Sequence, residues 1–295
     1  MKKLVQKHLV GIEKVSSIEL GISPYTYIGR YFFPAAHRSY RLHSHDRAIE
    51  FHYLYSGRQD NYQIGRKPYS FKSGDVFVAY PSEVHGTGIV PEAKGILYWL
   101  LITLEPEKHF LDYSDREGRE VLSLLKTFKK RSFCASDSLR SMFDSIFLIY
   151  TDKSPMKKIR IRNVVTEIIA CLSLSEQRNE NTTLSPKIAL VVNHLNRQKV
   201  SDASISLAEL ADIAGLTLPA FKKRFRMETG FPPLGYFLSL KIDKAKEMLA
   251  DDNVSISTIA YDLNFSSSQH FATIFKRHTG MTPGQFRKST IGIKK

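Results

Sequence analysis

The chain is poor in cysteine and has no long uninterrupted hydrophobic run. Cys134 and Cys171 are the only cysteines among 295 residues, which argues against a disulfide-rich secreted scaffold and favours two buried thiols in a reducing cytoplasm. The longest apolar run, residues 95–104, is shorter than the roughly 18 residues of a membrane span. The N-terminus starts basic, but Gln6, Lys7 and His8 interrupt the apolar run that a secretion signal needs, so no secretion signal is expected. We therefore expect a cytoplasmic protein without a membrane partner.

Acidic residues are in the minority. The 43 Lys and Arg against 29 Asp and Glu give a net charge of +14, which favours a polyanionic partner such as nucleic acid. Residues 183–295 hold 16 basic and 9 acidic residues, whereas the longer stretch 1–182 holds 27 and 20. The basic excess is therefore denser in the C-terminal part. The length exceeds the roughly 100–200 residues of one domain, so two domains are expected.

The apolar pattern changes along the chain. Residues 25–105 hold short β-branched and aromatic runs separated by turn signals, one of them at residues 56–57, which is typical of an antiparallel barrel or sandwich. Residues 116–175 have apolar positions at helical spacing. The polar stretch SEQRNENTT predicts a linker. We predict an α+β chain with a β-barrel domain at 1–110, a helical region at 111–174, a linker at 175–183 and an all-α domain at 184–295.

Two copies of one helical pattern lie about fifty residues apart. LAELADIAGLTLPAFKKRFRMETGFPP begins at Leu207, and ISTIAYDLNFSSSQHFATIFKRHTGMTP begins at Ile256, with one residue inserted in the second copy. In each copy a short helix with a central alanine meets a tight turn, since steeply crossing helices leave no room for a larger side chain. Thr217 or Ser266 is expected to cap the second helix.

The second helix of each copy has one apolar face and one polar face. Phenylalanines at i and i+4 predict the buried face, and the opposite face carries side chains suited to phosphates and base edges in the major groove. A structural repeat with a solvated basic face is the alternative, but the agreement of two copies favours DNA binding. The residues expected to contact double-stranded DNA are Pro219, Lys222, Lys223, Arg226, Ser267, Ser268, Gln269, Thr273 and Lys276.

With the motifs SLAELADIAGL, YFLSLKIDKAKEMLADDNVSISTIAYDLNF and HFATIFKRHTGMTPGQFRK, the last ~110 residues resemble the AraC/XylS family of bacterial transcription regulators. The resemblance implies a double helix-turn-helix domain that acts at promoter operators through RNA polymerase, and it favours an activator. Asn264 stands where the family usually has Gly, and Arg224 where an inward aliphatic is usual. Asn tolerates the left-handed conformation, whereas an inward Arg224 needs a partner or must extend to solvent.

The N-terminal motifs HSHDRAIEFHYLYSG and GDVFVAYPSEVH resemble those of the cupin barrel that such regulators carry as a sensor. Two histidines at i and i+2 of a strand point to the same side, so they can converge inside a barrel. The resemblance implies a small-molecule effector, often a carbohydrate. The residues expected to bind it are Arg30, Arg38, His43, His45, Glu50 and His85, with Tyr53 or Trp99 as a stacking platform.

Other interpretations remain open at this stage. Three histidines and a glutamate are a legitimate first-row metal set, so a metal-dependent cupin enzyme with an appended nucleic-acid-binding domain is one alternative. A purely architectural DNA-binding protein is another. We expect instead a non-enzymatic regulator with a metal-free pocket, no cofactor and no catalytic residues. Its helical region is expected to form a homodimer, because an apolar face unused by the barrel needs another surface.

Overall fold

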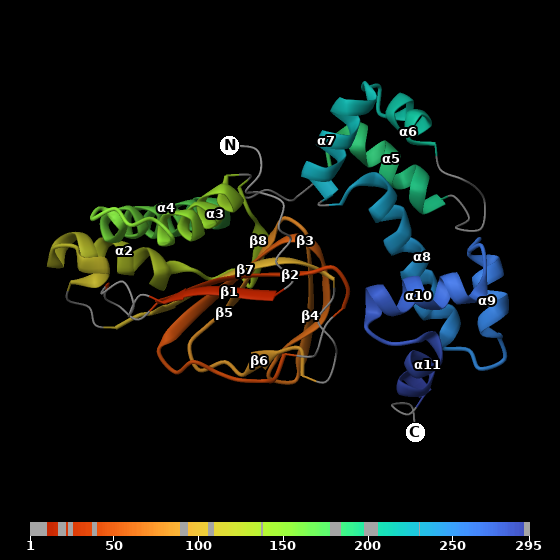
Figure 1. Cartoon of the computed structure of the whole chain (residues 1–295), viewed down its shortest axis with the longest axis horizontal. Helices are drawn as coiled ribbons and strands as arrows, with labels where there is room; N and C mark the ends of the chain where they lie inside the picture. Colours follow the sequence, from red (N-terminus) through yellow and green to blue (C-terminus); the bar gives the residue numbers. More distant parts are fainter. Residues whose placement is uncertain are drawn as a thin grey trace. The chain divides into compact units, whose positions relative to one another are not determined.

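The chain forms two compact units, which are described separately (Figure 1). The last helix of the first unit is α4 (Lys157–Gln177), and the first helix of the second unit is α5 (Pro186–Arg197). None of the helices in the described part of the chain is both long and apolar enough to cross a membrane. The computed structural model describes residues 11–16, 22, 26–36, 40–88, 94–105, 109–136, 138–177, 184–197, 206–229 and 231–291.

The first unit contains a curled antiparallel sheet with the strand order β1-β2-β7-β3-β5-β8, and β4 and β6 also pair with β3. Its β-branched and aromatic runs become strands as predicted, because such side chains pack well on a pleated surface. The strands are β1 (Gly11–Ser16), β2 (Thr26–Phe33), β3 (Ala48–Ile64), β4 (Lys67–Lys72), β5 (Asp75–Ala79), β6 (His85–Gly86), β7 (Gly95–Thr103) and β8 (Ser132–Cys134).

Strand β3 passes through the turn that the sequence predicts at residues 56–57, so that prediction is wrong. The register of β3 against β7 shifts between Leu54 and Ser56, and Gly57 has a φ of 114°. A β-bulge bends a strand without ending it, and glycine adopts the positive φ without steric cost. The later part of β3 therefore continues on to pair with β4 and β6.

The two faces of the sheet have different surroundings. One face packs against helices α2 (Asp115–Thr127), α3 (Leu139–Tyr150) and α4 (Lys157–Gln177), as Figure 1 shows, with a short 3-10 turn η1 (Phe110–Asp112) before them. Sheet residues such as Phe51 and helix residues such as Phe143 share this core. The other, concave face holds a smaller cluster that includes Leu54, Phe77 and Leu97. Helical periodicity therefore predicted these three helices correctly.

Helix α4 extends beyond the predicted start of the linker. Residues 175–177 are helical, and both Ser175 and Glu176 are buried. The Glu176 carboxylate accepts the backbone N–H groups of Lys129 at 2.6 Å and Lys130 at 2.7 Å. Composition alone does not show that a polar side chain accepts hydrogen bonds from the backbone of a neighbouring loop. This part of the linker prediction is therefore wrong. Its remaining residues, 178–183, lie outside the described residues.

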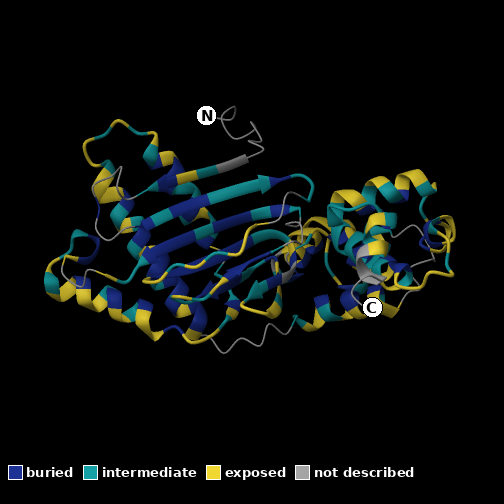
Figure 2. Cartoon of the chain, turned by 90° about the horizontal axis from the view of Figure 1, so that it is seen from below, coloured by how far each residue is buried: buried dark blue, intermediate teal, exposed yellow. Residues whose placement is uncertain are grey.

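The second unit is helical and has two small cores. One core joins α5, α6, α7 and the first half of α8 through residues such as Phe237, and the other joins the second half of α8 to the later helices through Ile242 and Leu249. Figure 2 shows that exposed positions alternate with buried ones along these helices. The helices are α5 (Pro186–Arg197), α6 (Leu207–Ile213), α7 (Leu218–Thr229), α8 (Pro233–Leu249), α9 (Ile256–Asp262), α10 (Ser268–Thr279) and α11 (Pro283–Ile291).

The repeat is visible in equivalent hydrogen bonds. Ala211 and Ala260 are each 2% exposed, as their crossing helices require. The Thr229 hydroxyl donates to the carbonyl of Phe225 at 2.7 Å, and the Thr279 hydroxyl donates to the carbonyl of Phe275 at 2.9 Å. Each copy therefore ends its second helix with the same side-chain bond.

Candidate functional site

The second helix of each copy, α7 in the first and α10 in the second, presents a polar face to solvent. Phe221 and Phe225 of α7 and Phe271 and Phe275 of α10 are fully buried. Of the nine residues expected to contact DNA, eight are exposed and Ser268 is half-buried. The exposed cations Lys222, Lys223, Arg226 and Lys276 are placed where phosphates can reach them.

The cap of α10 is shifted by one residue from its predicted position. The hydroxyl of Ser267, not that of Ser266, accepts the backbone N–H of His270 at 3.0 Å. Ser266 is the inserted residue of the second copy, and its hydroxyl lies 3.0 Å from Nδ1 of His270. His270 is exposed beside Gln269, so it belongs to the polar face although the sequence analysis omitted it. Its position three residues before Thr273 could have indicated this.

The two unusual positions of the repeat are resolved by local geometry. Arg224 is exposed and forms an ion pair with Glu228 at 2.7 Å, so it has the partner and the access to solvent that the sequence analysis required of a charge at this position. Glu228 also accepts the backbone N–H and the hydroxyl of Ser185, each at 2.8 Å. Asn264 has a φ of 52°, equivalent to Gly215 of the first copy with 58°. Asparagine therefore occupies a left-handed turn that it tolerates, as predicted.

In the first unit, four of the expected effector-binding residues converge. His43 forms an isolated bridge with His85 of β6, in which each backbone N–H donates to the other residue's carbonyl, at 3.0 and 2.8 Å. His45 is anchored nearby, because its carbonyl accepts the N–H of Ser82 at 2.8 Å. Glu50 comes from β3. One ligand atom from each of the four residues lies within 4.8 Å of the other three.

A buried carboxylate lies at the centre of this group. Oε2 of Glu50 lies 2.9 Å from Nε2 of His85, 3.5 Å from Nε2 of His45 and 4.0 Å from Nε2 of His43. Glu50 is 4% exposed and His85 is 1% exposed. Burial alone would raise the pKa of Glu50, but the surrounding imidazoles hold it well below its usual value, so the carboxylate is ionised. Burial lowers the pKa of His43, whereas the bond to Glu50 raises that of His85 against its burial.

A fourth imidazole, missed by the sequence analysis, lies beside the group. His52 follows Glu50 by two residues on β3 and therefore points to the same face. Its Nε2 lies 3.7 Å from Oε2 of Glu50 and 3.1 Å from the hydroxyl of Tyr62. Burial lowers its pKa to about 4, so it is neutral near pH 7. The period of two in EFHY was the signal that could have identified it.

The indole of Trp99 lies on the same concave face as the histidines. Trp99 of β7 is directly opposite His52 in the register, and Gly29 of β2 is opposite Trp99. A side chain at Gly29 would overlap the indole, so this glycine leaves the space that Trp99 occupies. Tyr53 instead faces the helices and stacks on Tyr98 with ring centroids 6.0 Å apart. Of the two candidate platforms, only Trp99 shares the face of the histidines.

The two arginines of the predicted effector site are not part of this group. Arg30 pairs with Tyr98 in the register, on the face opposite to that of Gly29, and it forms ion pairs with Glu13 at 2.7 Å and Asp144 at 2.9 Å. Side chains alternate between the two faces of a strand, so Arg30 points away from the histidines. Its ion pairs instead link β1 and α3 to β2. Arg38 lies outside the described residues.

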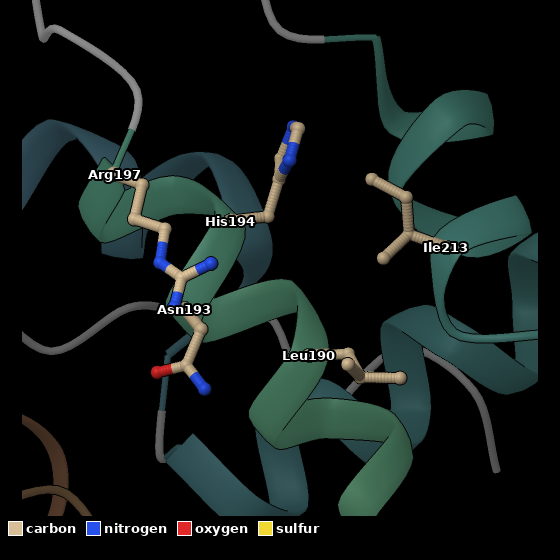
Figure 3. Close-up of a pocket in the computed structure, with 5 residues that line it drawn as sticks. All are labelled: Leu190, Asn193, His194, Arg197 and Ile213. Atoms are coloured by element: carbon tan, nitrogen blue, oxygen red, sulfur yellow. The ribbon is translucent and has the colours of Figure 1, made fainter.

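A hollow of about 470 Å³ lies between α5 and α6 in the second unit. In Figure 3, His194 of α5 and Ile213 of α6 lie on opposite sides of it, with Ile213 directed toward α5. The residues expected to bind DNA or the effector do not line this hollow. It is therefore not part of either candidate site. Its lining residues are Leu190, Asn193, His194, Arg197 and Ile213.

Comparisons with known proteins match both parts of the chain. Residues 27–158 match an AraC-like ligand-binding domain and residues 210–289 match a helix-turn-helix domain. An AraC-like transcription regulator of Streptomyces lividans is 31% identical over 35% of this chain and 33% of its own length. The transcriptional activator RhaS of Escherichia coli O157:H7 is 32% identical over 28% of this chain and 30% of its own length. The chain thus spans about a third of these curated relatives.

Among solved structures, an AraC-type transcriptional regulator from Chromobacterium violaceum is 25% identical. The match covers 36% of this chain and 92% of that one, with a TM-score of 0.33. The proteins named in these comparisons are transcription regulators and not enzymes.

Proposed function

Because this chain belongs to the AraC family of transcription regulators, as matches over both of its parts establish, we propose that it is a sequence-specific DNA-binding regulator controlled by a small molecule. The observation that carries the proposal is the repeated helix-turn-helix, in which two helices bury matched phenylalanines and expose polar faces. A purely structural repeat needs only its buried faces to match, whereas both copies here also expose a polar face with a cation at the equivalent positions Arg226 and Lys276. Regulation of transcription, not catalysis, is the activity that this surface supports.

Helices α7 and α10 insert into successive major grooves of operator DNA. Helix α8 has 17 residues and is therefore about 25 Å long, with one core packed on each half. A spacer of this size suits two helices that read groove segments about 34 Å apart along a duplex. Lys222, Lys223 and Arg226 neutralise phosphates, while Gln269 is suited to an adenine edge.

The effector binds in the concave face of the first unit. The imidazoles and the carboxylate of the cluster supply polar contacts, and Trp99 supplies an aromatic surface, which together favour a carbohydrate as the effector. The regulator acts as an activator through RNA polymerase, in line with the relative named as an activator. Effector occupancy changes the spacing of two DNA-binding units by shifting an existing equilibrium.

A homodimer is favoured by apolar side chains on α4, on the end of α3 and in the turn between them. Leu148 is 73% exposed and Leu174 is 58% exposed, and Met156 and Ile159 are also exposed. Large apolar side chains gathered on one helical layer lose contact with water when a second copy covers them. Other apolar side chains of these helices pack on their own sheet, so dimerisation is proposed only for the exposed ones.

The proposal is tested by selecting genomic fragments with the purified full chain at physiological salt. We expect one discrete motif with two half-sites about a helical turn apart. Recovery of unselected fragments, bound in a strongly salt-sensitive way, would instead leave only charge-driven binding and refute sequence-specific regulation. The genes beside the selected fragments then supply candidate effectors, which are tested by their effect on operator affinity.

Two variants test the assignment of the helix faces. Lys223→Ala should weaken binding to all sequences and lower the slope of affinity against salt by about 1, because one phosphate contact is lost. Gln269→Ala should relax base preference in one half-site, with a loss of about 1–3 kcal/mol on the preferred sequence. Lys72→Ala on β4 is the matched control, because Lys72 is exposed in the first unit. Unchanged affinity and preference in both test variants would exclude these faces from the interface.

A further inference from the structure

The hydrogen bonds of two clustered histidines fix which ring nitrogen carries a proton. Nδ1 of His85 lies 2.8 Å from the carbonyl oxygen of Glu83, and Nδ1 of His43 lies 3.0 Å from that of Arg41. A carbonyl oxygen only accepts hydrogen bonds, so both Nδ1 atoms are donors. In the neutral rings the Nε2 atoms are therefore lone-pair acceptors. Both lone pairs face the carboxylate of Glu50, which is itself an acceptor.

Within this group a donor to Glu50 can come from Nε2 of His45, 3.5 Å from the carboxylate oxygen, or from a proton on His85, but neither meets all the facing acceptors at once as a bound cation would. A proton held between His85 and Glu50 would satisfy that pair alone. Nε2 of His43 is buried and has no hydrogen-bond partner among the described residues. Burying such a group unpaired costs about 1–3 kcal/mol, so one extra proton leaves this cost in place. One ion bound by all the facing atoms removes it.

We propose that the N-terminal sensor binds one divalent first-row transition-metal ion through Nε2 of His43, His45 and His85 and the Glu50 carboxylate. The ligand atoms lie within 4.8 Å of one another. Atoms bound to one ion at 2.0–2.1 Å are at most about 4.2 Å apart, so small side-chain rotations are sufficient to close the site. Three imidazoles and one carboxylate suit zinc, iron, nickel or copper better than magnesium or calcium, which prefer oxygen ligands.

The surroundings of the cluster are those of a metal site. The bonds from Nδ1 to backbone carbonyls orient the imidazoles and direct Nε2 toward the centre, which is how outer contacts hold metal-binding histidines. His52 and Tyr62 add a polar second layer behind Glu50. The metal site rests on the proposed function in one respect: in an effector-binding pocket, the ion would form part of the surface that contacts the effector.

The test is calorimetric titration of the metal-stripped full chain with Zn²⁺ and Mn²⁺, with metal content measured after dialysis. We expect one ion per chain, and at least a roughly 100-fold weaker affinity in His45→Ala and in Glu50→Gln, since loss of an outer contact alone costs 10–100-fold. His109→Ala is the matched control, because this histidine is exposed and outside the cluster. Absence of a stoichiometric ion, or unchanged affinity in folded variants, would overturn the proposal.

Two further readouts keep the outcomes separate. The absorption spectrum of the Co²⁺-loaded wild-type chain should lack thiolate charge-transfer bands. If these bands are present, Cys134 or Cys171 binds the ion, and the proposed site is overturned even if the variants fail to fold. Operator affinity is measured on the same samples. Operator binding without a metal ion refutes the metal site alone. A bound ion without any discrete operator refutes the proposed function alone.

Discussion

The two copies of the repeat have separate cores, which predicts that one can be unfolded while the other stays folded. Phe275 of α10 is 0% exposed, and its ring lies 5.6 Å from that of Phe271 and 5.5 Å from that of Phe286, measured between centroids. Phe275→Ala removes these contacts and leaves a cavity that costs about 3–5 kcal/mol. That cost is a large fraction of the stability of a small helical core. Phe225→Ala is the matched change in the first copy.

Amide hydrogen exchange and operator footprinting measure this effect. In Phe275→Ala, protection should fall in α9, α10 and α11 while α5, α6 and α7 keep theirs, and one half-site should lose its footprint. Phe225→Ala should give the opposite pattern, because its ring belongs to the other core. Equal loss of protection in both sets of helices would show that α8 couples the copies into a single cooperative unit. The separation into two cores would then be refuted.

Three further predictions concern stability and assembly. Glu176→Ala leaves two backbone N–H groups without their acceptor, so urea denaturation should show a loss of about 2–5 kcal/mol, and a loss below 1 kcal/mol would contradict the capping role. Asn264→Gly removes the strain of a left-handed residue, so the free energy of unfolding should rise by up to about 1 kcal/mol, and a clear fall in the midpoint of thermal unfolding would contradict this account. Leu148→Glu should convert the proposed homodimer to a folded monomer in sedimentation experiments, whereas an unchanged oligomeric state would exclude this surface as the interface.

Local patterns predicted the helices well and the strands less completely. Apolar residues at helical spacing depend on nearest neighbours, so α2, α3, α4 and α8 follow from the sequence alone. Strand β3 was divided at its bulge, because serine and glycine give the same signal in a bulge as in a turn. The strands β4 and β6 were missed because they are short, and β4 carries three polar residues among six.

The four residues of the histidine cluster were predicted to converge, but the strand register that brings them together was not predicted. The spacing of two residues between His43 and His45 suggested convergence, but the bridge between His43 and His85 joins positions 42 residues apart. Such long-range pairing depends on the register of several strands, which no local pattern contains. The same limit explains Arg30, whose side of β2 depends on how that strand pairs with β7.

The exposed faces of the two copies differ in chemistry although their buried faces match. In α7 the face is dominated by Lys222, Lys223 and Arg226, whose attraction to phosphates falls with salt and carries little sequence information. In α10 the face combines Gln269 and Thr273 with one cation, which favours contacts to base edges. If these faces contact DNA as proposed, we expect the first copy to contribute mainly affinity and the second mainly discrimination. Rising salt should release the half-site bound by α7 first, while base substitutions should be felt most in the half-site bound by α10.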